Sequence, residues 1–93
     1  MIIGVVSATL SIPSSQSLKD KRAVLRSLRD RLINKMNVSV AEVGSQDSWK
    51  MAEMAFVTVA AESEVAQKRI SDIHDYLRRD PTFTLVHIET QML

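Results

Sequence analysis

Basic side chains concentrate in one stretch of the sequence, from Ser17 to Met36. This stretch holds seven of the twelve Lys and Arg residues but only two of the eleven carboxylates. Arg22, Arg26 and Arg29 recur at spacings of four and three, which places them on one side of a helix. Guanidinium groups at this spacing can contact successive phosphates of a nucleic acid. The residues that we expect to contact RNA or a ribosomal particle are Lys19, Lys21, Arg22, Arg26 and Arg29.

The same residues also fit a purely structural interpretation. Exposed helix faces are ordinarily charged, and arginine stems can cover the edge of a hydrophobic core. A structural surface would normally carry interleaved Glu for pairing with residues four positions away, and this stretch contains none. Both interpretations stay open on the sequence alone.

Side chains suited to catalysis or metal binding are sparse. The sequence has no cysteine, which excludes a disulfide framework, a thiolate nucleophile and a cysteine-based metal site. His74 and His87 are the only imidazoles, and they lie on different predicted elements. Glu42, Asp47 and Glu53 gather near one predicted hairpin, where they form a polar rim without a nucleophile. We therefore predict a non-catalytic protein without a cofactor, a metal ion or a small-molecule substrate.

The enzyme alternative is an acylphosphatase, because that enzyme class binds phosphate with a glycine-bearing loop, an arginine and an asparagine. Arg22 lies near a suitable position. The loop at residues 13–16 has no glycine, however, and neither Asn34 nor Asn37 falls on the third predicted strand. The residues that this chemistry requires are therefore missing.

The composition is that of one folded domain covering residues 1–93. Hydrophobic residues make up 45% of the chain and charged residues 25%, which is typical of globular proteins. The formal net charge of +1 says little about partners. The first four residues carry no basic region of a signal peptide, and no apolar run is long enough to span a membrane. We expect a soluble cytoplasmic protein with no membrane partner.

The basic stretch has the start and the apolar stripe of an amphipathic helix. Ser17 is a predicted N-cap, and Asp20 lies three residues later, where a carboxylate can reach back to free amides. A second helix is predicted at residues 64–79, with Ser63 as its N-cap and Pro81 beyond its end. The apolar stripe of the first helix consists of Leu18, Val24, Leu25, Leu28, Leu32 and Met36, and that of the second of Ala66, Ile70, Ile73 and Leu77.

Four stretches rich in β-branched residues predict strands at residues 2–12, 38–43, 50–62 and 83–92. The resulting order is β-α-β-β-α-β. Two right-handed crossovers joined by a hairpin give the ferredoxin-like α+β sandwich, in which two helices cover one face of a four-stranded antiparallel sheet.

The uncovered face of this sheet is a second candidate site. Strand alternation assigns to it a set of largely apolar side chains that could join two copies of the chain: Val5, Met54, Phe56, Leu85 and His87. RNA-recognition motifs stack bases on this face, but the first strand here has no aromatic residue. The alternative to RNA binding is therefore a homodimeric interaction module, joined through this face or a strand edge. Trp49, the only tryptophan, is either a partner anchor or, as we expect, packed over a core edge.

Three segments carry a family resemblance: Leu18 to Arg22, Asn37 to Val43, and Gln46 to Trp49. Together they resemble the YlxP-like family of small bacterial proteins, a domain of unknown function, over nearly the whole length. The resemblance implies a ferredoxin-like fold, a bacterial origin and genes that often lie beside translation genes. It implies no activity and no functional residues. Gly44 departs from the acidic residue expected in relatives, which weakens any role for a carboxylate there.

Overall fold

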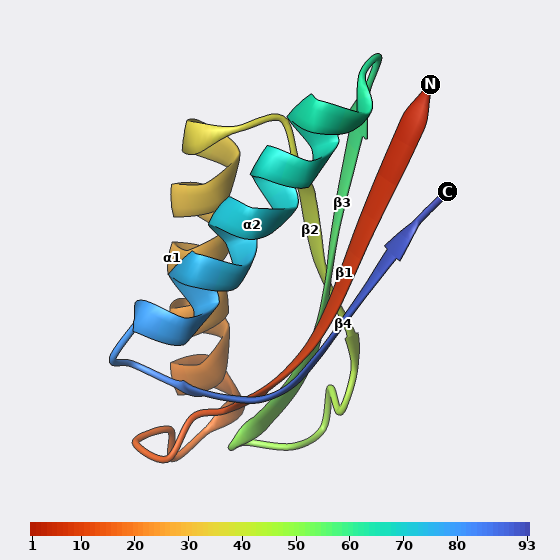
Figure 1. Ribbon diagram of the computed structural model, residues 1–93. Helices are drawn as coiled ribbons and strands as arrows, with labels where there is room; N and C mark the ends of the chain where they lie inside the picture. The colour runs from red at the N-terminus through yellow and green to blue at the C-terminus, as the bar shows by residue number, and fades with distance from the viewer.

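Four strands and two helices alternate in the order β-α-β-β-α-β in the computed structural model, which describes residues 1–93 (Figure 1). The elements are β1 (Ile2–Ser11), α1 (Leu18–Lys35), β2 (Ser39–Gly44), β3 (Met51–Ala60), α2 (Ser63–Arg79) and β4 (Thr84–Met92). The strands form one antiparallel sheet in the order β2-β3-β1-β4, and both helices lie on the same face of it (Figure 1). This arrangement confirms the ferredoxin-like prediction.

The two helices begin differently. Ser17 caps α1 as predicted, because its hydroxyl oxygen accepts a hydrogen bond from the Asp20 amide at 3.0 Å. The Asp20 carboxylate in turn accepts a bond from the Gln16 amide at 3.0 Å. The predicted N-cap of α2 is wrong: Ser63 is already helical, and Glu62 occupies the cap without a side-chain hydrogen bond. Tertiary packing therefore has to hold the start of α2.

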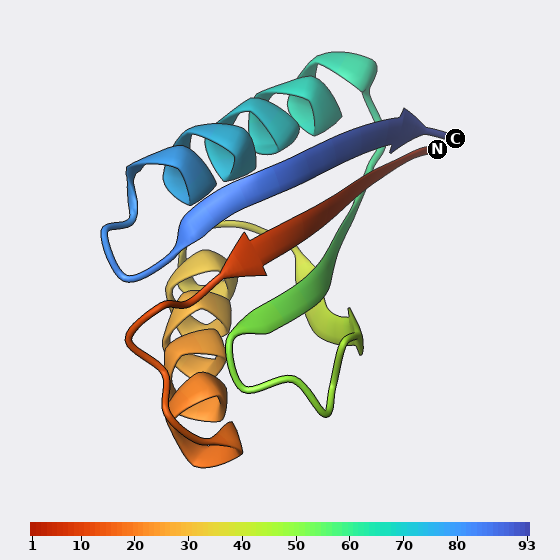
Figure 2. The same ribbon diagram turned by 90° about the horizontal axis from the view of Figure 1, so that it is seen from below.

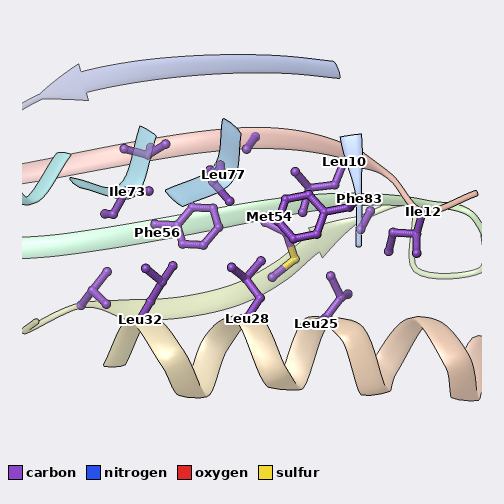
Figure 3. Packing of buried hydrophobic residues seen from close by; sticks show 14 residues of the cluster. Leu10, Ile12, Leu25, Leu28, Leu32, Met54, Phe56, Ile73, Leu77 and Phe83 are labelled. Carbon is purple, nitrogen blue, oxygen red and sulfur yellow. The ribbon is translucent and has the colours of Figure 1, made fainter. Parts of the chain in front are cut away.

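The hydrophobic core fills the space between the helices and the sheet. Leucines of α1 and apolar residues of α2 meet side chains of β1 and β3 there (Figure 3). The predicted apolar stripes of both helices supply these contacts, and so does the predicted inner side of β1. The buried residues from these elements include Val6, Ala8, Leu10, Leu25, Leu28, Leu32, Ile73 and Leu77.

The predicted orientation of β3 is wrong. Phe56 and Met54 lie in the core, with exposed fractions of 0% and 3%, and point between the two helices (Figure 3). The pairing with β1 explains this, because Phe56 is opposite Val6 and Met54 is opposite Ala8. Residues opposite one another in an antiparallel pair share a face. Neither side chain can therefore form an interface on the uncovered face or stack an RNA base.

The predicted position of Leu85 is also wrong. The register between β1 and β4 shifts after Thr9, so that His87 is opposite Thr9 while Leu85 is opposite Leu10. The extra residue, Val86, is 57% exposed. This bulge reverses the alternation of β4 and turns Leu85 toward the core. His87 stays on the uncovered face.

The uncovered face of the sheet still has an apolar centre. Val57 and Val59 are 37% and 46% exposed, and they lie opposite Val5 and Ile3 of β1. Ala55, two residues before Val57 on β3, continues this surface. We call these five residues, Ile3, Val5, Ala55, Val57 and Val59, the open face.

Candidate nucleic-acid interface

Three arginines of α1 line a groove between this helix and the edge strand β2. Arg22, Arg26 and Arg29 are exposed, and they border a hollow of about 260 Å³. The floor and the far wall come from Leu25, Val40, Ala41, Glu42 and Met54. Lys19, one turn before Arg22, is exposed as well. We call Lys19, Arg22, Arg26 and Arg29 the basic face of α1. The predicted residues are thus brought together, apart from Lys21.

The basic face is largely free of compensating carboxylates. Lys19, Arg22 and Arg26 form no ion pair, and Arg29 contacts only its chain neighbour Asp30, at 3.3 Å. That contact joins two side chains that are each 53% exposed, so water screens it strongly. The positive charge of this flank is therefore available to a ligand.

The opposite flank of α1 differs, because its cations contact α2. The Arg31 guanidinium donates a hydrogen bond to the Tyr76 hydroxyl at 3.0 Å and lies 3.7 Å from the Asp80 carboxylate. The Tyr76 hydrogen bond, assisted by the Asp80 charge, raises the pKa of Arg31. The Lys35 ammonium lies 5.2 Å from the centre of the Tyr76 ring, which is cation–π distance. Arg31 and Lys35 therefore help to join the two helices.

Lys21 does not belong to the basic face, which contradicts its predicted role as a phosphate contact. Its side chain is only 1% exposed. The ammonium donates hydrogen bonds to the carbonyl oxygens of Ser45 and Met51, at 3.0 and 3.1 Å, with Gln46 at 3.4 Å. It also lies 2.8 Å from Glu42 Oε2. A cation with four oxygen neighbours and almost no exposure cannot reach an external phosphate.

The ion pair between Lys21 and Glu42 leaves the groove with a net positive charge. Glu42 is the only carboxylate that lines it. Glu42 Oε2 is buried, and the Lys21 ammonium is its only partner. Because Lys21 compensates the charge of Glu42, the three arginines keep their net positive charge. The sequence pattern does not predict this pair, because Lys21 and Glu42 lie on different elements and only the fold brings them together.

The loop between β2 and β3 lies at the same end of the molecule as the first turn of α1 (Figure 2). Lys21 fastens this loop to α1 through its hydrogen bonds to the loop's carbonyl oxygens. Lys50 fastens it to the loop before α1, by bonds to the carbonyl oxygens of Pro13 and Ser15 at 2.6 and 2.7 Å. Trp49, next to Lys50, is 55% exposed and is not a member of the hydrophobic core cluster. More than half of the Trp49 side chain is thus open to solvent, including any part of it that covers a core edge.

The remaining candidates for chemistry are dispersed. His74 Nε2 is 2.8 Å from the Thr90 hydroxyl, whereas His87 Nε2 is 3.0 Å from Glu89 on the uncovered face. No three His, Cys, Asp or Glu side chains come together as metal ligands. A larger hollow of about 560 Å³ between α1 and α2 is lined by the Arg31 and Tyr76 network and by both acidic and basic residues. Neither helix has an apolar stretch of the length needed to cross a membrane.

Comparison with known proteins gives the family. Residues 3–90 match the family described as protein of unknown function DUF503. The chain belongs to the DUF503 family. It is also 31% identical, over 80 aligned residues, to the uncharacterized protein YlxP of Bacillus subtilis (strain 168). The aligned region covers 86% of this chain and 87% of that protein. The YlxP-like resemblance is thereby confirmed, and neither description of these DUF503 proteins names an activity.

Proposed function

We propose that this DUF503 protein is a non-catalytic binding module that docks on RNA, free or in a ribosomal particle, through the basic face of α1. The observation that supports the proposal is the arginine-lined groove beside β2, whose single carboxylate is already compensated by Lys21. The proposal includes a cytoplasmic location, where RNA and ribosomes are found. Lys19, Arg22, Arg26 and Arg29 are the proposed phosphate contacts.

The helix geometry suits a sugar-phosphate backbone. Residues four apart on a helix are separated by about 6 Å along its axis. Arg22 and Arg26 therefore present two guanidiniums at a spacing close to that of neighbouring phosphates, and Arg29 continues the row. Each planar guanidinium can donate two parallel hydrogen bonds to one phosphate. Contacts of this kind sense charge and shape rather than base sequence.

The test is RNA binding across a salt series, with the double variant Arg22→Gln/Arg26→Gln. If each arginine neutralises one phosphate, the slope of log affinity against log salt becomes shallower by about 1.4 to 1.8 for the pair. The matched control is Arg78→Gln/Arg79→Gln, which removes two exposed charges from the last turn of α2. Both variants lower the net charge by the same amount. A difference between their salt slopes therefore shows that the position of the arginines on α1 matters, and not the net charge alone.

Three results would contradict this proposal. The first is a wild-type protein that binds neither RNA nor ribosomal subunits at low salt. The second is an unchanged slope in the Arg22 and Arg26 variant. The third is an equal effect of the control pair, which would mean that only net charge matters.

A second candidate function is a homodimeric interaction module without a nucleic-acid role. The open face supports it, because its apolar centre includes two valines that are more than a third exposed, Val57 and Val59. The edges of the sheet, β2 and β4, offer a further way to pair two copies. Sedimentation of the wild-type chain tests this candidate, and a monomer at all accessible concentrations would exclude it.

A further inference from the structure

Trp49 is an exposed aromatic side chain on an ordered loop. It is the only tryptophan in the chain, 55% exposed, and outside the hydrophobic core. Elsewhere the large aromatic Phe56 is fully buried. An indole held partly in water gains only part of the free energy that burial would give, and its exposed surface is available to a ligand.

Hydrogen bonds hold the loop that carries Trp49 both before and after this residue in the chain. Before it, the Ser48 amide donates to the Ser45 carbonyl oxygen at 3.0 Å. After it, the Met51 amide donates to the Ser48 hydroxyl oxygen at 3.0 Å, and Lys50 holds the loop before α1. A loop with these bonds is ordered before any ligand arrives, which lowers the entropy cost of binding.

The same loop is joined directly to the basic face of α1. The Lys21 ammonium binds carbonyl oxygens on both sides of Trp49 in the chain, those of Ser45 and Met51. Lys21 immediately precedes Arg22, the first arginine of the groove. Figure 2 shows the loop beside the first turn of α1. Trp49 is therefore held at the end of the molecule where the row of arginines starts.

We propose that Trp49 stacks on an unpaired base of the RNA whose phosphates contact the basic face, so that the ligand is single-stranded or looped RNA. This inference rests on the proposed function and specifies its ligand class. Bases in a continuous A-form duplex are stacked on one another, and their planes are closed to a side chain. An aromatic ring and a basic groove at the same end of a molecule are a combination that can bind unpaired strands, because every base has a planar face.

The experiment compares a single-stranded polyuridylate oligonucleotide with a blunt duplex RNA carrying the same number of phosphates. Affinity is measured by anisotropy of labelled RNA for the wild type, Trp49→Ala and Trp49→Phe. Trp49→Ala should weaken single-strand binding about 5- to 150-fold, whereas Trp49→Phe should retain much of it. The control is Val86→Ala, which shortens an apolar side chain of similar exposure on β4, at the opposite edge of the sheet.

Three further readouts separate stacking from a loss of charge or of fold. The salt slope should stay unchanged in Trp49→Ala, since no phosphate contact is removed. Wild-type tryptophan fluorescence should be quenched by the single strand and not by the duplex. Circular dichroism should show both Trp49 variants folded, because the side chain lies outside the core.

The possible failures are distinguishable. If Trp49→Ala binds the single strand as tightly as the wild type while Arg22→Gln/Arg26→Gln weakens it, stacking is excluded and the phosphate surface stands. Equal wild-type affinity for the duplex and the single strand also excludes it. If the wild type binds neither RNA at low salt, both proposals are overturned.

Discussion

Replacing Lys21 by Met tests whether this buried cation fastens the β2–β3 loop. Methionine keeps most of the aliphatic stem within the core but removes the ammonium. The substitution deprives Glu42 Oε2 of its only partner, and the Ser45 and Met51 carbonyl oxygens of a donor within 3.1 Å. Removing one member of a buried ion pair costs about 3–5 kcal/mol, because the other charge stays buried.

This loss is large for a chain of 93 residues. Domains of this size have unfolding free energies of about 5–15 kcal/mol. A loss of about 3–5 kcal/mol therefore lowers the melting temperature by roughly 12 to 40 °C, taking about 4–8 °C for each kcal/mol. Glu42 is 20% exposed, so water can reach part of its carboxylate. We therefore expect the loss of unfolding free energy and the fall in melting temperature to lie in the lower half of these ranges.

The assay is urea unfolding followed by circular dichroism, with Trp49 fluorescence reporting on the loop. Arg22→Met is the matched control, since Arg22 is the next residue and exposed, and it should change stability by no more than about 0.5 kcal/mol. The double variant Lys21→Met/Glu42→Gln should lose less than the two single losses together, because no unpaired charge remains. A Lys21→Met protein within about 1 kcal/mol of the wild type would refute the reasoning.

Two further predictions concern the open face and the pH dependence of stability. Val57→Asp should convert a homodimer formed by the open face into a monomer without unfolding it, because the side chain is 37% exposed; a variant that still sediments as a dimer places the interface elsewhere. Burial, with a smaller effect of Arg78, lowers the pKa of His74 below 6.5. Because the unfolded chain then binds more protons, stability falls as the pH drops from about 6.5 toward the folded pKa. His74→Gln should flatten the pH profile of urea midpoints, and an identical profile would contradict the assignment.

The amino-acid sequence by itself determines the elements and their order. Short β-branched runs, the apolar stripes of two helices and the Ser17 cap are local patterns, and each of them needs only the geometry of its own segment. The concentration of arginines on one side of α1 is local in the same sense. The sequence therefore predicted that Arg22, Arg26 and Arg29 share one side of α1, whereas their role as phosphate contacts stays a proposal.

Only the tertiary structure decided which side chains turn inward on β3 and β4. Both alternating sets of β3 are largely apolar, with one polar residue each, Glu53 and Thr58, so the sequence pattern does not distinguish Phe56 from Val57 as the inner residue. The pairing of Phe56 with Val6 settles the choice, because a shift of one residue exchanges the two faces. On β4 the bulge beside Thr9 reverses the alternation and turns Leu85 inward.

The tertiary structure also decided what each cation of α1 does. Lys21, Arg22 and Arg31 look alike in the sequence, but their partners lie far along the chain: a loop and Glu42 for Lys21, Tyr76 and Asp80 for Arg31, and none for Arg22. Local patterns place a side chain on a helix face, whereas burial and charge compensation depend on what the fold packs against that face. The sequence therefore determined that α1 is basic, and the fold determined which of its charges remain free to bind.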